Sequence, residues 1–272
     1  MRTAVVGHVE WVRFAAVERL PKRGEIIAAS GTWEEPAGGG AVAAVRLREV
    51  AGACDFFVAV GYDWAGREAL GALTLLGLDV HAATRDEPQR RAFTFVDADG
   101  ERTITTLGPK LHPHGADPLP WVELAEVDTV YFTAGDVAAL RAARRARILV
   151  ATAREMHVLE KAGVQLDALV HSGTDQAERY VPGRLEPPPK LVVTTMGREG
   201  GRFVSADSEG RYTAADLPGP LADAYGAGDS FAAGLAYGLA GEDSVEAALA
   251  VASEFAAKAL TVRGAYGGPS RP

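Results

Sequence analysis

The residues with the clearest capacity for chemistry form a glycine-rich turn that leads into an Ala-rich stretch, Asp223-Ala-Tyr-Gly226-Ala227-Gly228-Asp229-Ser-Phe231. Two glycines let the backbone curl, so that successive N–H groups at a helix start face one point and bind an anion. We expect Asp229 in the first helical turn, where the same positive field lowers its pKa and keeps it ionised. Such a carboxylate could accept a hydroxyl proton while the turn holds a phosphoryl group. A helix start with a capping Asp is the simpler alternative.

The elements that must position this turn alternate along the chain. Short apolar runs bounded by Gly or polar residues alternate with Ala-rich stretches of helical period, which predicts βαβ units around a parallel sheet. The predicted strands are Thr3–Gly7, Phe57–Gly61, Thr129–Thr133, Ile148–Ala151, Ala168–His171 and Leu191–Thr195. The predicted helices are Gly40–Ala51, Ala65–Leu76, Ala138–Ala146, Ala227–Leu239 and Ser244–Leu260.

Two segments break this alternation. Residues Arg91–Thr106 alternate in polarity around Asp97-Ala-Asp-Gly100, whose Asp-Gly step favours a tight hairpin turn. Residues Trp11–Trp33 carry spaced apolar side chains and form a second candidate for extended structure. We expect one domain over residues 1–272, in which segments of approximately 11–33 and 91–106 pair into a small β-sheet lid over a site. The alternative is that both segments are ordinary surface loops.

Composition narrows the class of protein. A chain of 272 residues with 47% hydrophobic side chains can bury one sizeable α/β core. The single cysteine, Cys54, excludes an intramolecular disulfide framework and fits a reducing compartment, so we expect a cytoplasmic protein. A net charge of -8 argues against a nucleic-acid partner, and no apolar run is long enough for a membrane span.

Other nucleotide-binding motifs are missing. No lysine follows a glycine in this sequence, so a Walker P-loop, Gly-x-x-x-x-Gly-Lys, is excluded. The first predicted strand leads into Gly7-His8-Val9-Glu10, which is not the Gly-x-Gly-x-x-Gly turn of a dinucleotide oxidoreductase.

Gly226-Ala227-Gly228-Asp229 after Asp223 closely resembles the C-terminal signature of the ribokinase-like (PfkB) carbohydrate kinases, Asp-Thr-x-Gly-Ala-Gly-Asp-x-Phe. Further segments resemble that family in the same order over nearly the whole chain. They are Pro36-Ala-Gly38-Gly39-Gly40-Ala41-Val42-Ala43, Gly61-Tyr-Asp63-Trp-Ala-Gly66, Thr194-Thr195-Met-Gly197-Arg-Glu-Gly200-Gly201 and the run from Ala252 to Ala265. The resemblance implies a three-layer α/β sandwich with a mostly parallel central sheet and a small β-sheet lid.

The resemblance also implies a reaction, transfer of the γ-phosphate of ATP to a hydroxyl of a sugar or nucleoside-like small molecule. Asp229 would be the catalytic base, the backbone of Ala227, Gly228 and Asp229 would be the anion hole, and Gly226 belongs to the same catalytic turn. Glu10 falls where the family commonly places an Asp that binds sugar hydroxyls, and a solvated loop carboxylate is its alternative. The other implied contacts are Gly38, Gly39 and Gly40 with the substrate, and Thr195, Gly197, Gly200 and Ser253 with the nucleotide.

Four positions depart from the family pattern. Val42 stands where the first signature usually has Asn, and Ala224 replaces the usual Thr after Asp223. The Asn-x-x-Glu motif, which helps to organise Mg²⁺ and phosphate, appears as Ser172-Gly-Thr-Asp175, whose oxygens suit a hard cation but have a shorter reach. Asp175 and Asp223 are therefore the candidate metal residues, with a monovalent cation expected near Asp223.

Two other functions stay open at this stage. A ribokinase-fold sensor could bind a sugar or nucleotide with weak catalysis or none, but the intact Gly-Ala-Gly-Asp argues against a pure binding module. A kinase for the hydroxymethyl group of a vitamin or pyrimidine would keep the mechanism and change the pocket. In each case the partner is a small molecule, and dimerisation through the lid, as in relatives, is a further expectation.

Overall fold

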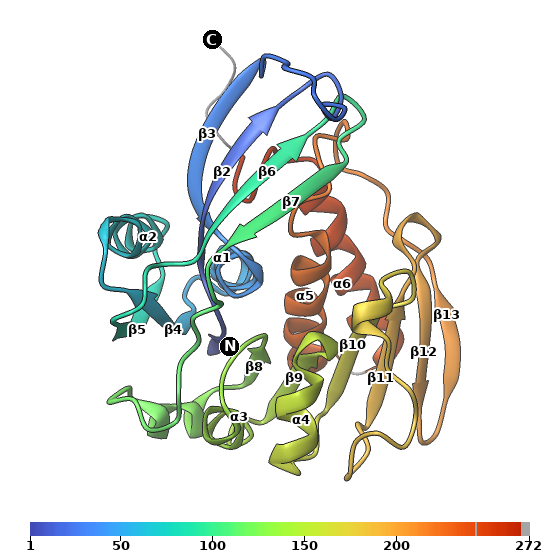
Figure 1. The fold of residues 1–272 in the computed structure, drawn as a ribbon. Coiled ribbons are helices and arrows are strands. Elements are labelled where there is room, and N and C mark those ends of the chain that lie inside the picture. Colours follow the sequence, from blue (N-terminus) through green and yellow to red (C-terminus); the bar gives the residue numbers. More distant parts are fainter. Residues whose placement is uncertain (243, 268–272) are drawn as a thin grey trace.

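The centre of the computed structural model is a nine-stranded sheet, and the structure describes residues 1–242 and 244–267 (Figure 1). The strand order is β13-β12-β11-β10-β9-β8-β1-β4-β5. In this sheet the strands from β11 across to β5 pair in parallel, whereas β12 and β13 add an antiparallel edge. The strands are β1 Thr3–Val6, β4 Asp55–Gly61, β5 Asp79–Arg85, β8 Thr129–Phe132, β9 Ile148–Thr152, β10 Ala168–Ser172, β11 Leu191–Thr195, β12 Gly201–Ser205 and β13 Glu209–Tyr212.

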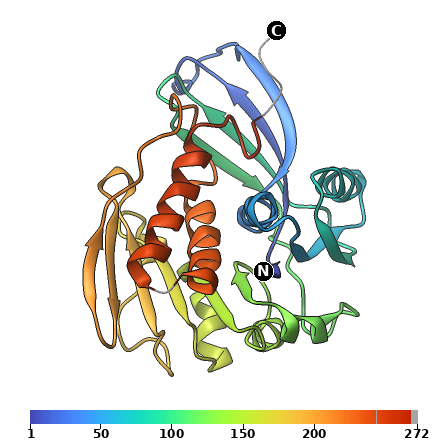
Figure 2. The ribbon, with the colours of Figure 1, turned by 180° about the vertical axis from the view of Figure 1, so that it is seen from behind.

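Helices cover both faces of this sheet. One face packs against α1 (Gly39–Ala51), α2 (Trp64–Leu75), α5 (Ala227–Gly241) and α6 (Val245–Leu260), and Figure 2 shows α5 and α6 side by side on it. The other face packs against the 3-10 helix η1 (Trp121–Glu126), α3 (Val137–Ala143) and α4 (Met156–Ala162). The predicted fold class, a three-layer α/β sandwich with a mostly parallel sheet and a small separate sheet, is confirmed.

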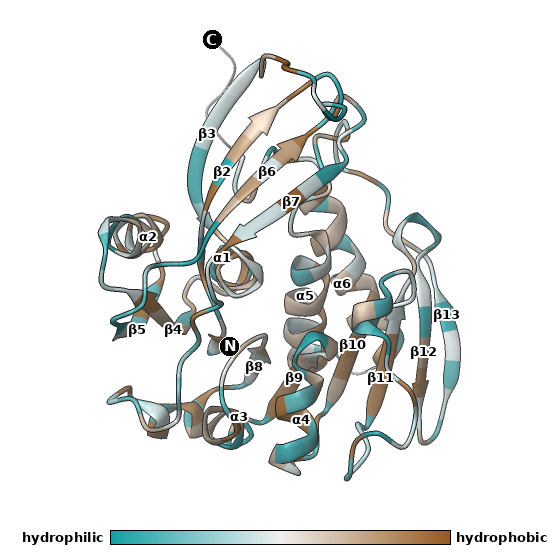
Figure 3. Cartoon of the chain, in the orientation of Figure 1, coloured by the Kyte–Doolittle hydropathy of each residue, from teal (hydrophilic) through white to brown (hydrophobic). Residues whose placement is uncertain are grey.

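The parallel strands are apolar on both faces because both faces are covered. Along each central strand, side chains point alternately to the two faces of the sheet and so join two different hydrophobic cores. In β1, for example, Val5 packs toward α1 and α5, whereas Ala4 and Val6 pack toward α3. The antiparallel edge is more polar, and β13 shows mostly hydrophilic colours in Figure 3.

The small sheet has the order β3-β2-β6-β7, with bounds of Gly31–Ala37, Glu10–Ala16, Arg91–Val96 and Arg102–Leu107 in that order. It joins the two segments that broke the sequence alternation, because β2 and β6 pair in parallel from Trp11↔Arg91 to Ala16↔Val96. The predicted pairing is therefore confirmed, but its limits were wrong. Strand β2 begins at Glu10 and β3 runs on to Ala37, while residues 17–30 between them contain no strand.

Gln89 fixes the joint between the two sheets. Its side-chain amide donates to the carbonyl of Val9 at 2.7 Å, and its side-chain oxygen accepts from the N–H of Gly61 at 3.0 Å. Asp63, in the same Gly-x-Asp-x-x-Gly turn, accepts from the N–H of Gly66 and from that of Gln89. The Gly61–Gly66 turn thus holds Gln89 at the point where the small sheet joins the large one.

Several elements were not predicted from the sequence. They are β5, α4, β12 and β13, which are short or carry polar residues on an edge. The connection from β10 to β11, residues 173–190, contains only the 3-10 turn η3 (Gln176–Glu178) and no α-helix. In the described part of the chain, no helix is both long and apolar enough to cross a membrane.

Candidate active site

The glycine-rich turn lies where the sequence places it, at the start of α5. Gly226 precedes the helix with a φ of 72°, a left-handed conformation that favours glycine. A Cβ at this position would also lie 2.8 Å from Cγ1 of Val42. No side chain caps the start of α5 among the described residues, so the first backbone N–H groups are available to a ligand.

The space around the Cα of Gly228, at the start of α5, is not filled by other atoms of the protein. An ideal Cβ on Gly228 would meet no atom within 4 Å, and its φ is not in the left-handed region. Neither packing nor backbone conformation therefore requires a glycine here. The space that a side chain would fill is left next to the N–H groups, as an anion cradle requires.

Asp229 lies in the first turn of α5 and faces two other elements. Its Oδ1 accepts a hydrogen bond from the hydroxyl of Tyr131, at the end of β8, at 3.2 Å. On the other side stands Gly39 at the start of α1, where a Cβ would come within 2.5 Å of the same oxygen. Glycine at position 39 therefore makes room for the carboxylate.

The expected direction of the Asp229 pKa was wrong. Burial raises the pKa of Asp229 above its ordinary value, although the charge of Arg154 and the Tyr131 hydrogen bond both lower it. Loss of hydration outweighs the helix field because protein surrounds the carboxylate on several sides. A base whose pKa lies closer to the working pH accepts a proton more effectively, so the correction suits the proposed role.

Glu10 lies in a buried polar group at the end of β1 and the start of β2. Its Oε1 forms an ion pair with Nε of Arg90 at 3.1 Å and lies 3.8 Å from Nε2 of His8. Burial raises the pKa of Glu10 and lowers that of His8 well below its ordinary value. Gly38 packs against both, since its Cβ would lie 3.1 Å from Glu10 and 3.2 Å from His8. Glu10 is not a solvated loop carboxylate.

Asp223 holds the turn in shape. Its two carboxylate oxygens accept from the N–H groups of Tyr225 at 2.8 Å and Gly264 at 2.6 Å, and the residue is fully buried. The hydroxyl of Tyr225 in turn accepts from the N–H of Gly38 at 3.1 Å, which ties the turn to α1. Burial raises the pKa of Asp223.

A second charged group follows β9 and β10. Arg154, in η2 (Ala153–Glu155), forms ion pairs with Glu178 and with Asp175, the latter at 3.5 Å. The side chain of Asp175 is 44% exposed, whereas that of Glu178 is only 12% exposed. Burial raises the pKa of Glu178, and the charge of Asp229 raises it further. Glu178 is therefore the less exposed of the two carboxylates, and its charge interacts with that of Asp229.

The predicted nucleotide residues follow β11 and lie on α6. Gly197 and Gly200 flank η4 (Gly197–Glu199) with φ values of 60° and 78°. A Cβ on Gly200 would lie 2.1 Å from the carbonyl of Tyr212, so this glycine is needed for the β12–β13 hairpin. The hydroxyl of Ser253 donates to the carbonyl of Leu249 at 2.9 Å, so its proton is already used in a hydrogen bond within the helix. Contact of these residues with a nucleotide stays a prediction.

The structure brings Glu10, Gly38, Gly39 and Asp229 together, with Gly226, Ala227 and Gly228 at the same helix start. Gly40 instead lets α1 approach the backbone of His8, where a Cβ would lie 2.6 Å away. Sequence reasoning missed the side chains that surround the carboxylates, because no motif marks them. They are Arg90, Lys110, Tyr131, Arg154, Glu178 and Tyr225.

A family model described as pfkB family carbohydrate kinase matches residues 2–168 and 138–271. No curated protein matches the sequence. Among solved structures, a putative ribokinase from Agrobacterium tumefaciens is 21% identical with a TM-score of 0.80, covering 99% of this chain and 94% of that chain. Ribokinase from Thermotoga maritima is 20% identical with a TM-score of 0.75, covering 97% and 94%.

Arabidopsis thaliana ribokinase, solved with ribose and ATP, is similar to the same extent. It is 20% identical with a TM-score of 0.74, covering 96% of this chain and 93% of that chain. At such identities the structural likeness establishes the fold, whereas the family model spans almost the entire sequence. The chain belongs to the pfkB family of carbohydrate kinases.

Proposed function

We propose that this chain transfers the γ-phosphate of ATP to a hydroxyl of a sugar or nucleoside-like small molecule, with Asp229 as the catalytic base. The observation that carries the proposal is the placement of the Asp229 carboxylate beside the uncapped start of α5 and the open space at Gly228. A base and an anion cradle on one helical turn can serve the two ends of a phosphoryl transfer.

In this mechanism the acceptor hydroxyl lies against Asp229, held by Glu10 and the backbone at Gly38 and Gly39. The proton of the acceptor hydroxyl passes to Asp229 while the hydroxyl oxygen forms a bond to the γ-phosphorus. The bond from that phosphorus to the β-phosphate oxygen breaks, and ADP leaves. The N–H groups of Ala227 and Gly228 stabilise the charge on the phosphoryl oxygens.

Divalent metal use follows from the donors at the end of β10. The carboxylates of Asp175 and Glu178 offer the oxygen ligands that suit Mg²⁺, so these residues fit the ion, directly or through water. Mg²⁺ would neutralise charge on the ATP phosphates. We keep Asp223 as a residue near a monovalent cation, but both its oxygens already accept backbone hydrogen bonds, so its main role is to fix the turn.

The printed names of similar structures support a nucleotide and leave the acceptor open. A ribokinase from Cryptococcus neoformans was solved in complex with ADP. Other similar structures are a Methanocaldococcus jannaschii nucleoside kinase and a microbiome-derived acarbose kinase, at 16% and 21% identity. We further propose that residues 1–272 act as one kinase domain with the small sheet as its lid, and that ATP use and the buried thiol of Cys54 favour the cytoplasm.

The test is Asp229→Asn, assayed for ADP release with Mg-ATP and a panel of sugars, nucleosides and vitamin alcohols. Asn keeps the shape and the contact with Tyr131 but accepts no proton, so we expect turnover to fall by about 10²–10⁴-fold with ATP binding retained. Asp79→Asn, at an exposed position on β5, is the matched control. Turnover of Asp229→Asn within a few-fold of wild type would contradict the role. Ligand binding without any turnover in the wild type would favour the sensor.

A further inference from the structure

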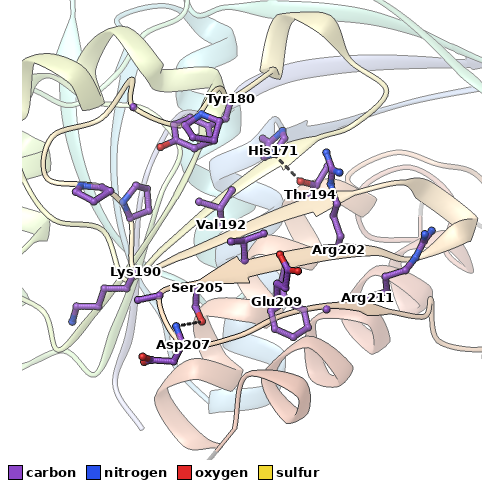
Figure 4. Close-up of a pocket in the computed structure, with 18 of the residues that line it drawn as sticks. His171, Tyr180, Lys190, Val192, Thr194, Arg202, Ser205, Asp207, Glu209 and Arg211 are labelled. Carbon is purple, nitrogen blue, oxygen red and sulfur yellow. Dashed lines mark hydrogen bonds between the residues drawn. The ribbon is translucent and has the colours of Figure 1, made fainter.

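A wide groove lies on the outer face of β10, β11, β12 and β13, away from α5 and α6 (Figure 4). Parallel strands are usually joined by a helix that covers one face of the sheet. Here residues 173–190, which join β10 to β11, contain no α-helix and leave this face open. The groove has a volume of about 990 Å³, and none of its lining residues belongs to the candidate active site.

A polar row crosses the groove. The strand registers place His171 opposite Thr194, Thr194 opposite Arg202 and Arg202 opposite Arg211, so one residue from each of four neighbouring strands lies in line. All four line the groove, and Figure 4 shows Thr194 between His171 and Arg202. Residues paired across neighbouring strands point to the same face, so these side chains share one side of the sheet.

The two arginines of this row are a like-charged cross-strand pair. Such a pair is destabilising when no counter-charge joins it. Within residues 1–242 and 244–267, neither Arg202 nor Arg211 forms an ion pair, although 15 ion pairs are present elsewhere. Two guanidinium groups side by side present several N–H donors, which match the oxygens of a phosphate or sulfate group.

His171 adds a buried polar group to the same row. The residue is 7% exposed, and its Nδ1 has no hydrogen-bond partner among the described residues. Its Nε2 lies 2.8 Å from the hydroxyl of Thr194. Burial lowers the pKa of His171 and the charge of Arg202 lowers it further, although a backbone hydrogen bond at Ser172 opposes the shift. When Thr194 donates to Nε2 in the neutral ring, Nδ1 carries the proton.

The next row of the groove is apolar. Val192 pairs with Val204 on the neighbouring strand, and both line the groove together with Tyr180 and three prolines, Pro182, Pro188 and Pro189. Glu209, which pairs with Val204, continues this row on β13 two residues from Arg211, and Asp207 lies in the turn between β12 and β13. The two arginines outnumber this one neighbouring carboxylate, so an anionic group is favoured at their end of the groove, with an apolar body along the valines and prolines.

We propose that this groove binds a small molecule that carries a phosphate or sulfate monoester on an apolar body. The anion bridges Arg202 and Arg211 at the end of the row that holds Thr194 and His171, while the apolar part covers Val192 and Val204. The site lies on the opposite face of the sheet from α5, so it is distinct from the transfer site and does not depend on the proposed kinase function. Thr194 is adjacent in sequence to Thr195, which faces the other side of the sheet.

Phenyl phosphate is the probe, titrated into the full-length protein and followed by calorimetry and by backbone amide NMR shifts. We expect shifts at Thr194, Arg202 and Arg211, and none with benzyl alcohol, which lacks the charge. Arg202→Gln and Arg211→Gln should each weaken binding by about tenfold or more, because each removes charge-assisted hydrogen bonds. Both side chains are exposed, and each substitution relieves the like-charge contact, so melting temperatures should not fall. Arg67→Gln and Arg145→Gln, exposed arginines on α2 and after α3, are the matched controls.

Three results would overturn the proposal. One is an unchanged dissociation constant in the double variant Arg202→Gln/Arg211→Gln. Another is a set of shifts confined to Gly228 and its neighbours, which would place the anion at the start of α5. The third is a dimer in sedimentation velocity whose contact protects residues 201–212 from hydrogen exchange, since a second copy would then occupy this face.

Discussion

The hydroxyl of Tyr131 lies 3.2 Å from Oδ1 of Asp229, although 98 residues separate them in the sequence. Tyr131 is the third residue of β8 and is 1% exposed, packed in the core between the sheet and α5. A tyrosine held this tightly has one orientation, so its hydroxyl fixes the carboxylate of Asp229. The sheet thereby sets the position of the base that α5 carries.

We predict that Tyr131→Phe lowers kcat with little change in the KM for ATP or the acceptor. The hydroxyl lowers the pKa of Asp229, so its loss raises that pKa. Because the base works only when deprotonated, the acid limb of the pH–rate profile should move to higher pH. The loss of one hydrogen bond to a charged group predicts a decrease of about tenfold at neutral pH.

The control for this prediction is Tyr62→Phe, since Tyr62 is 78% exposed. A structural role alone would lower stability without moving the pH profile. An unshifted acid limb in Tyr131→Phe, with normal folding, would therefore contradict the positioning role.

Metal dependence forms a second prediction. Excess EDTA should abolish ATP-dependent turnover, because no Walker lysine is present to neutralise the phosphate charge. Glu178→Gln should raise the Mg²⁺ concentration for half-maximal rate by about tenfold, since the variant removes a buried ligand or a water-holding carboxylate. Asp175→Asn should have a smaller effect because Asp175 is more exposed. Glu160→Gln, on the outer surface of α4, serves as the control. Full turnover in EDTA would refute the metal requirement.

The sequence predicted the sheet, the main helices and the Asp229 turn because each depends on local pattern. Hydrophobic period marks buried strands and helices, and Gly226 marks a left-handed turn before α5. Contacts between distant segments left no such pattern. The Tyr131–Asp229 bond and the Arg90–Glu10 pair arise only when the strands are brought side by side. Their residue types alone give no sign of a role.

The pKa of Asp229 was missed for a related reason. The sequence shows its place at a helix start, where the dipole lowers the pKa, but not how much protein surrounds it. Asp175 was named from its spacing within a motif and stays a prediction, whereas the lower exposure of Glu178 cannot be seen in the sequence. Prediction from the sequence thus worked for backbone placement and failed for the balance of charge and burial.

Glu35 leads to a prediction on stability. It lies on β3, and its Oε1 accepts from the N–H of Ala265 at 2.6 Å and from the indole of Trp33 at 3.3 Å. Burial raises the pKa of Glu35 from 4.5 to about 7 in the folded protein. The folded state therefore binds more protons than the unfolded chain between these pH values. The contribution of Glu35 to the free energy of unfolding is therefore fully present below the unfolded-state pKa of 4.5. It is lost as the pH rises through about 7.

We expect Glu35→Gln to remove this loss, because Gln can accept the same hydrogen bonds without titrating. The difference in unfolding free energy between variant and wild type should grow by on the order of 1–2 kcal/mol from pH 5 to pH 8. Urea unfolding at several pH values measures it, with Glu18→Gln at an exposed position as the control. Parallel pH curves for wild type and Glu35→Gln would show that Glu35 does not titrate in this range.

The last prediction concerns the small sheet as a lid. Its tip touches the turn that precedes the anion cradle, since the N–H of Ala224 donates to the carbonyl of Gly100 at 3.0 Å. Its base is joined to the site through Arg90 and Glu10. Every residue of β7 is exposed, so the sheet has an open edge that could close on ligand or pair with a second subunit.

Hydrogen exchange on segments 11–33 and 91–106, with and without acceptor plus a non-hydrolysable ATP analogue, tests closure. If the sheet closes, the amides at its tip should exchange on the order of tenfold more slowly in the ternary complex, because closure removes the open state that exchanges.

Gly100→Ala is the matched variant. Gly100 has a φ of 78°, and a Cβ there would lie 3.2 Å from the carbonyl of Ala222, so the tip contact should loosen and the protection should shrink. Closure excludes water from the phosphoryl group, so the same variant should also hydrolyse ATP faster without acceptor. Protection that depends on protein concentration and not on ligand would instead assign the sheet to a dimer contact, and protection confined to the core would refute the lid.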